Sequence, residues 1–146
     1  YFTGVSRESA RIIDEQIRNT ESRSAPSVEA MHDMKADVGR MKEAILLGDV
    51  RRFAEILGSS WQAKKKMARG ISNENIEKIH DLALSAGAIA GKVTGAGGGG
   101  YMMFVVPPRL RHALIRTLCQ NGGQVMDFHF TKEGVASWRT GSGSLD

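Results

Sequence analysis

The chain has 146 residues and a formal net charge of +4, with 41% hydrophobic and 25% charged residues. This is the composition of a globular chain of one domain, and about 68–70% of the unfolded surface can be buried at this length. No apolar stretch reaches the ~20 residues that cross a bilayer, and a single cysteine, Cys119, excludes an internal disulfide.

The first half of the chain predicts four helices, over residues 6–20, 27–47, 49–69 and 72–86. Their apolar residues recur at three- and four-residue steps, which places them on one face of each helix. Ser6 and Asp49 are expected caps of the first and third helices, and Ser72 and Asn73 are expected to begin the fourth. The residues expected to face the core are Ile12, Ile13 and Ile17; Val28, Met31, Met34, Val38, Met41 and Ile45; Val50, Phe53, Ile56, Leu57 and Trp61; and Ile76, Ile79, Leu82 and Ala83.

After Gly87 the hydrophobic period changes from that of a helix to that of strands. Short apolar runs predict strands over 88–93 and 101–106, the second of them central, and Pro107 ends it. A fifth helix is expected over 108–121, with Leu110, Leu114, Leu118 and a buried Cys119. Alternation predicts a strand over 124–131, and we expect a last short strand over 135–138.

Together with a strand at Tyr1–Thr3, these elements predict an α+β fold. We expect a small, mainly antiparallel sheet covered by helices on one side. The domain is expected to cover 1–140, followed by a flexible tail at 141–146. Tyr1 stands where a strand is ending, so we expect a fragment whose upstream part is missing. The lone Cys119 fits a reducing cytoplasm.

The charged and histidine residues do not indicate a nucleic-acid or metal site. The basic runs Arg51-Arg52 and Lys64-Lys65-Lys66 lie on predicted helices without interleaved aromatics, so we interpret them as solvated faces. His32, His80 and His112 stand singly on helices, without metal-ligand spacing. Asp127 and His129 share a strand face and are interpreted as exposed polar residues rather than an acid–base pair.

The most informative feature is the loop formed by Gly95, Ala96, Gly97, Gly98, Gly99 and Gly100. It satisfies G-x-G-x-x-G, but a strand rather than a helix follows, which excludes a dinucleotide-binding turn. It also lacks the Gly-Lys-Ser/Thr ending of a Walker loop. Two interpretations stay open: a loop whose backbone approaches an anion, and a tight hairpin without a ligand.

The residues from Lys92 to Tyr101 resemble the third motif of the galactokinase, homoserine kinase, mevalonate kinase and phosphomevalonate kinase superfamily, the GHMP kinases. Thr3-Gly4-Val5-Ser6-Arg7 resembles the entry to the C-terminal domain in the sugar-kinase members. Phe128-His129-Phe130, followed by Gly134 and Trp138, resembles the ending of the D-glycero-D-manno-heptose 7-phosphate kinases within this superfamily. The likeness covers nearly the whole chain.

The resemblance implies a ferredoxin-like C-terminal domain in a two-domain kinase that transfers phosphate from ATP, with Mg²⁺, to a sugar phosphate. Gly95, Ala96, Gly97, Gly98, Gly99 and Gly100 match the motif that shapes the ATP and acceptor pocket. Thr94 and Lys92 flank the motif and are the implied substrate contacts. Arg7, in the first turn of the first predicted helix, is a further candidate contact for a sugar phosphate, and a solvated arginine is the competing interpretation. The phosphate loop and the catalytic residues would belong to an N-terminal domain, so this chain alone should be inactive.

Two alternatives stay open. The acceptor of a kinase in the same superfamily could be fucose, galactose or a mevalonate. The chain could also be a ferredoxin-like binding or regulatory module without chemistry, in which case the glycine loop is a structural turn. Neither alternative predicts binding to nucleic acid or membrane.

Overall fold

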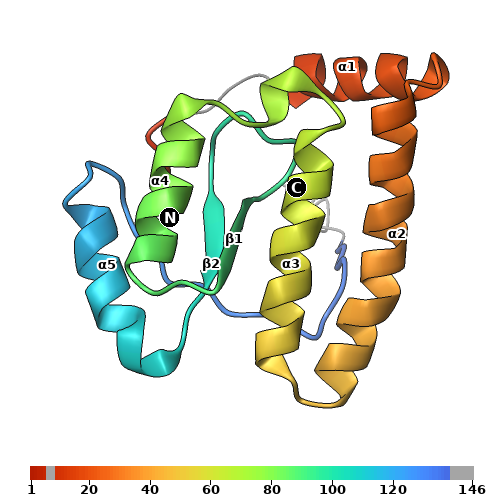
Figure 1. Ribbon diagram of the computed structural model, residues 1–146. Helices are drawn as coiled ribbons and strands as arrows, with labels where there is room; N and C mark the ends of the chain where they lie inside the picture. The colour runs from red at the N-terminus through yellow and green to blue at the C-terminus, as the bar shows by residue number, and fades with distance from the viewer. Residues whose placement is uncertain (6–8, 139–146) are drawn as a thin grey trace, which may run out of the picture.

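The computed structural model describes residues 1–5 and 9–138. Arg7, the cap expected at Ser6 and the tail at 141–146 therefore lie outside the described residues. The described elements, in chain order, are α1 (Ser9–Glu21), α2 (Ala25–Leu46), α3 (Val50–Lys65), the 3₁₀ turn η1 (Arg69–Ile71), α4 (Glu74–Ser85), β1 (Ala90–Val93), β2 (Met102–Val105), the 3₁₀ turn η2 (Pro108–Leu110) and α5 (Arg111–Cys119) (Figure 1).

Two of the expected helix caps are confirmed. The side chain of Asp49 accepts a hydrogen bond from the amide of Arg52 at the start of α3. The side chain of Asn73 accepts one from the amide of Ile76 at the start of α4. Each bond satisfies an amide that a helix start leaves without a partner, so both helices begin where the sequence indicates.

The sheet is small and antiparallel. β1 pairs with β2 in a register that sets Ala90 opposite Val105 and Val93 opposite Met102. On the other side of β2, Phe2 forms single bridges to Tyr101 and to Gln124. The expected strand at the N-terminus therefore exists as a bridge, and β2 has neighbours on both sides.

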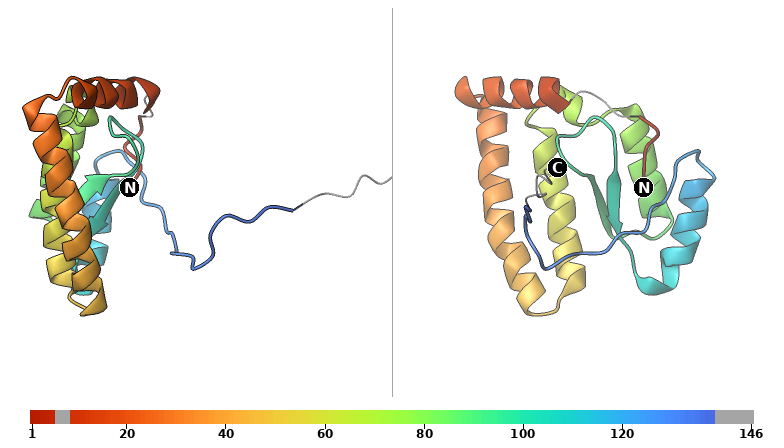
Figure 2. Two further views of the ribbon diagram at one scale, coloured as in Figure 1. Left: turned by 90° about the vertical axis from the view of Figure 1, so that its right-hand side faces the viewer. Right: turned by 180° about the vertical axis from the view of Figure 1, so that it is seen from behind.

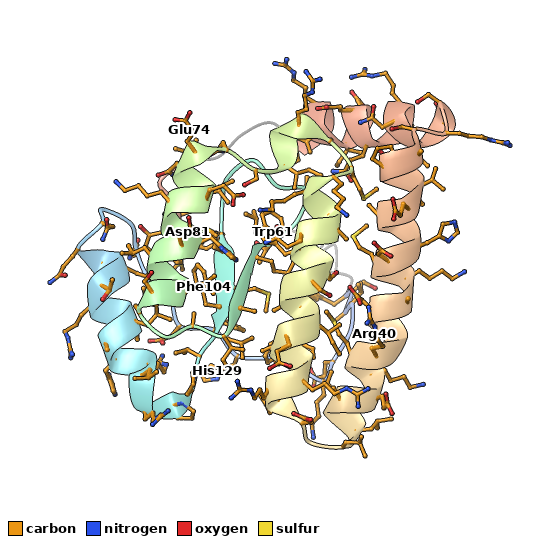
Figure 3. All side chains as sticks on the ribbon, in the orientation of Figure 1. Arg40, Trp61, Glu74, Asp81, Phe104 and His129 are labelled. Carbon is orange, nitrogen blue, oxygen red and sulfur yellow. The ribbon has the colours of Figure 1, made fainter. Side chains whose placement is uncertain are left out.

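The helices lie on one face of the β1–β2 hairpin, as expected. Figure 1 shows α3 and α4 in front of the two strands, and the view from behind in Figure 2 shows the hairpin in front of them. Val93 and Met102 are buried, and Trp61 from α3 lies between that helix and the hairpin (Figure 3). The fold is therefore a mainly helical α+β domain.

Three helices expose part of the apolar face that the sequence predicts to be buried. In α2 the buried residues are Ser27, Ala30, Asp37 and Ala44. The exposed residues of the apolar faces expected in the first three helices are Ile13, Ile17, Met31, Val38, Ile45 and Val50. Small residues bring α2 close to α3, and the carboxylate of Asp37 accepts hydrogen bonds from Arg40 and, at 3.2 Å, from the Ser59 hydroxyl. The face of α2 that is buried is therefore the one that carries small residues, which allow close approach to α3, and the hydrogen-bonded Asp37.

The C-terminal part also differs from the expectation. Apart from the bridge at Gln124, residues 124–138 form no regular element, so the strands predicted over 124–131 and 135–138 are wrong for this chain. Figure 2 shows this segment leaving the body of the molecule. Phe130 is 86% exposed and Trp138 is 82% exposed. Cys119 is at the end of α5 but is exposed rather than buried.

Among the described residues, no helix is long and apolar enough to cross a membrane.

Candidate functional site

The glycine-rich loop connects β1 to β2, which confirms the strand–loop–strand context. It lies at the end of the molecule where α1, η1 and the start of α4 meet (Figure 1). Its glycines with positive φ are Gly95, Gly97, Gly98, Gly99 and Gly100. Residues with a side chain rarely adopt positive φ, so the backbone path of the loop depends on these glycines.

The loop is fixed to neighbouring segments by hydrogen bonds. The amide of Gly98 donates to the carbonyl oxygen of Ile71 at 2.8 Å, and the side-chain amide of Asn73 donates to the carbonyl oxygen of Gly98 at 3.1 Å. The amide of Gly100 donates to the carbonyl oxygen of Val5 at 2.7 Å, and the carbonyl oxygen of Gly100 accepts from the Thr3 amide at 2.9 Å. The loop is therefore held from two sides before any ligand binds.

Four other amides of the loop have no such partner. Among the described residues, those of Gly95, Ala96, Gly97 and Gly99 donate no hydrogen bond. Successive amides in a glycine-rich turn that are free to donate are a common way to bind an anion, which keeps this interpretation of the loop open. Ala96 packs against the hydrophobic core, which steadies this part of the loop.

Two lysines lie beside the loop. Lys64, near the end of α3, donates to the carbonyl oxygen of Gly95. Burial lowers the pKa of Lys64 below its ordinary value of 10.5, and the positive charge of Lys92 on β1 lowers it further. An anion beside Lys64 would favour the charged form of this lysine and so oppose both effects.

The lysine run at 64–66 is the feature that sequence reasoning misjudged. Lys64 is half-buried against the loop, and Lys65 forms an ion pair with Glu77 at 3.0 Å, so only Lys66 is fully exposed. The position of these lysines is the signal that could have indicated their role. They lie at the end of the helix that precedes η1, and η1 contacts the loop. Basic residues near a helix end were expected to face water, but here tertiary packing turns two of them inward.

The structure places the other residues singled out from the sequence in separate surroundings. The amide and hydroxyl of Thr94 both donate to the carbonyl oxygen of Tyr101, at 2.8 and 3.1 Å, so its side chain closes the base of the loop. Lys92 is half-buried beside the loop. Asp127 forms an ion pair with Arg111 at 2.9 Å rather than a pair with His129. In residues 1–5 and 9–138, no cluster of three acidic, histidine or cysteine side chains is placed to hold a metal ion.

A cavity of about 490 Å³ opens beside β2, between α5 and residues 125–130. Its walls are mostly apolar and include Phe104, Leu114, Leu118, Val125 and Phe128. Phe104 is visible between α4 and the strands in Figure 3. The cavity is bordered by the exposed segment that forms no strand.

Comparison with protein families matches the description "GHMP kinases C terminal" over residues 41–124. A D-glycero-alpha-D-manno-heptose 7-phosphate kinase from Campylobacter jejuni is 45% identical over 139 residues, which are 95% of this chain and 40% of that protein. An L-fucokinase/L-fucose-1-P guanylyltransferase from Bacteroides fragilis is 31% identical over 105 residues, covering 72% of this chain and 11% of that protein. The chain therefore spans less than half the length of the curated relatives it matches.

Two solved structures of kinases are also similar to this chain. A C. jejuni protein described as a candidate sugar kinase matches 77% of this chain and 34% of its own, with 48% identity and a TM-score of 0.58. An L. major mevalonate kinase in complex with R-mevalonate matches 82% of this chain and 36% of its own, with 18% identity and a TM-score of 0.73. The second likeness concerns the fold alone.

Proposed function

The chain belongs to the GHMP kinases, as a C-terminal domain, and from that membership we propose that it forms half of an ATP-dependent sugar kinase. The observation that carries this proposal is the glycine loop, which combines amides that have no partner among the described residues, anchors on two sides, and the adjacent Lys64 and Lys92.

Phosphoryl transfer depends on positioning and on neutralising charge spread over the transferred group. The amides of Gly95, Ala96, Gly97 and Gly99 would donate to phosphate oxygens of ATP. Because hydrogen bonds hold the loop in advance, these donors need no reorganisation when charge develops. Lys64 and Lys92 would neutralise part of that charge. In the proposal, Thr94 serves the pocket by fixing the base of the loop, whereas Arg7 stays an expected contact outside the described residues.

The described residues do not supply everything that such a reaction needs. Mg²⁺ bound to ATP would supply further charge neutralisation, and no acidic cluster in the described residues suits it. We therefore place the Mg²⁺ ligands, the phosphate loop and the catalytic residues in an N-terminal kinase domain of the same polypeptide.

That domain would pack on the open side of the sheet. Phe128 and Phe130 line the cavity beside β2, and their exposed side chains give it an apolar surface that such a domain could cover. The C. jejuni kinase is long enough to contain such a domain, because this chain corresponds to only 40% of its length. Alternating apolar residues at 126, 128 and 130 suit a strand completed by that domain.

For the acceptor we propose D-glycero-D-manno-heptose 7-phosphate, on the basis of the 45% identity to the C. jejuni kinase of that name. The lower identities to a fucokinase and to mevalonate kinases at 28–29% make fucose and mevalonate the competing acceptors.

The test is the full-length protein that contains this chain, purified and assayed for ATP consumption with heptose 7-phosphate, fucose, galactose and mevalonate. We expect turnover with the heptose phosphate and little with the others. A preference for another acceptor would overturn the heptose assignment and keep the kinase. Absence of turnover with all of them would overturn the kinase and favour a binding module.

A further inference from the structure

A second groove lies next to the glycine loop, on the other side of η1. Its walls come from α1 and η1, and the lining residues are Arg11, Ile12, Glu15, Arg18, Arg69, Gly70 and Ser72. The groove has a volume of about 820 Å³. Figure 1 shows α1 lying across the end of the molecule where the loop is found.

The groove is cationic. It presents three guanidinium groups, those of Arg11, Arg18 and Arg69, and one carboxylate, that of Glu15. Arg11 and Arg18 are seven residues apart on α1 and therefore share a helix face. Within the described part of the chain, none of the three guanidinium groups has an ion-pair partner. Their donors are free for a ligand.

The groove is held in a fixed position relative to the loop. The carboxylate of Glu15 accepts a hydrogen bond from the backbone amide of Arg69 at 3.0 Å, which joins α1 to η1. Gly70 lies against Ile12, since a β-carbon at this glycine would come within 3.3 Å of the Ile12 side chain. The neighbouring Ile71 accepts from the Gly98 amide, so the groove and the loop share the wall formed by η1.

We propose that this groove binds the phosphate monoester that the acceptor carries before phosphoryl transfer. Guanidinium groups present parallel donors that match phosphate oxygens, and three of them suit a dianionic group. The triphosphate of the nucleotide has its own donors in the loop amides and the two lysines. This inference rests on the proposed function, because it assumes that the acceptor is a sugar phosphate.

The experiment uses the full-length protein with Arg11→Met, Arg18→Met and Arg69→Met, and Arg116→Met on α5 as the matched control. Loss of a charge-assisted hydrogen bond predicts a rise of about 10- to 100-fold in the KM for heptose 7-phosphate. The KM for ATP should change by less than about twofold. The Arg116→Met control should have the same KM for heptose 7-phosphate and for ATP as the parent protein, within about twofold.

A substitution of opposite sign separates binding from structure. Glu15→Gln keeps an acceptor for the Arg69 amide but removes the negative charge from the groove. We expect the KM for heptose 7-phosphate to fall by about two- to fivefold, the size of a partly screened charge effect. A purely structural role of these residues would not improve binding of the phosphorylated acceptor.

Two results would overturn the inference: an unchanged KM for heptose 7-phosphate in all three arginine variants, or a rise in the KM for ATP in its place. If the parent protein has no kinase activity, calorimetric binding of heptose 7-phosphate to the same variants decides the matter. Binding that the arginine substitutions weaken would support the groove while the kinase fails. Binding that they leave unchanged, or none, would overturn the groove as well.

Discussion

The backbone of Gly98 is bonded directly to that of Ile71, with 2.8 Å between the amide nitrogen and the carbonyl oxygen. This bond joins the connection between two strands to the 3₁₀ turn that separates α3 from α4. It makes the shape of the candidate nucleotide site depend on a segment that lies 27 residues earlier in the sequence (98 − 71), and it brings Gly97 against the same turn.

Gly97→Ala should therefore damage both stability and activity. Gly97 has a φ of +113°, and a β-carbon there would lie 2.7 Å from the carbonyl oxygen of Ile71. We expect a loss of about 1–3 kcal/mol in the free energy of unfolding and about 100-fold in kcat/KM, because the loop must move. Thermal unfolding and steady-state kinetics of the full-length protein measure the two effects.

Gly95→Ala is the control for this prediction. Gly95 also has a positive φ, of +73°, but nothing lies within 4 Å of the added β-carbon. Gly95→Ala therefore has the cost of a positive φ but no steric clash, and the variant should lose less free energy of unfolding than Gly97→Ala. Equal losses in the two variants would show that contact with Ile71 does not shape the loop.

Asn73 has two roles, and Asn73→Ala should remove both. Its side-chain oxygen caps α4 through the Ile76 amide at 3.1 Å, and its side-chain nitrogen donates to the Gly98 carbonyl oxygen. We expect a loss of about 1–2 kcal/mol in stability from the cap, with reduced activity from the freed loop. Asn73→Asp keeps the cap and loses the donor, so it should restore most of the stability and little of the activity. Full activity in Asn73→Asp would contradict the second role.

Sequence reasoning located the elements whose signals are local. Asp49 and Asn73 cap the helices that they were expected to cap, and the glycine loop joins two strands because apolar runs border it. The buried face of α2 could not be predicted this way. Val38 and Ile45 satisfy the helical period, but the contact with α3 requires close approach, which Ala30 and Ala44 allow and larger side chains prevent.

The site was predicted less completely than the fold. The glycines are recognisable from sequence because their number and order are unusual, whereas Lys64 looks like any surface lysine until α3 is packed against β1. The groove that contains Arg11 and Arg69 joins residues from two elements far apart in sequence, so spacing alone gives no signal. The alternation at Met126, Phe128 and Phe130 predicts a strand that this chain does not form, because a strand needs a neighbour to pair with.

Phe130→Ser tests whether the C-terminal segment is covered in the full-length protein. Phe130 is 86% exposed in this chain, where a serine would cost little. If the N-terminal domain covers it, the change should lower the free energy of unfolding of the full-length protein by about 2–4 kcal/mol, since a buried aromatic side chain is lost. Lys132→Ser, two residues further on, is the control. An unchanged melting temperature in Phe130→Ser would show that the segment stays in solvent.

The link between α3 and α4 should be sensitive to acid. Burial raises the pKa of Glu77, but hydrogen bonds from Ser72 and Lys65 and the charge of Lys65 outweigh it, so the pKa lies below its ordinary value of 4.5. A lowered carboxyl pKa contributes stability above the ordinary value, and this contribution is lost as the pH falls through the lower, folded-state value. Glu77→Gln should therefore be less stable than the parent at pH 7 and equal to it in strong acid.

The size of that effect is modest, because the side chains of Lys65 and Glu77 are 21% and 40% exposed. We expect about 0.5–1 kcal/mol at pH 7, reduced further at high salt. Glu55→Gln, which loses a more exposed pair with Arg51, should change stability less. Denaturant unfolding at several pH values measures both, and a difference for Glu77→Gln that persists in strong acid would assign its cost to packing instead.

Lys64 should give nucleotide binding an unusual alkaline limit. Burial and the charge of Lys92 lower the pKa of Lys64, so its positive charge is lost at a lower pH than that of an ordinary lysine. A bound triphosphate favours the charged form, and affinity for ATP should therefore fall as the pH rises through this lowered pKa. Lys64→Met should weaken ATP binding by about 10-fold near neutral pH and flatten the alkaline decline. Calorimetric titration with ATP across the alkaline range compares it with Lys66→Met, which changes the exposed lysine at the same helix end. Parallel pH curves for the two variants would show that the decline belongs to another group and that Lys64 serves only to hold the carbonyl oxygen of Gly95.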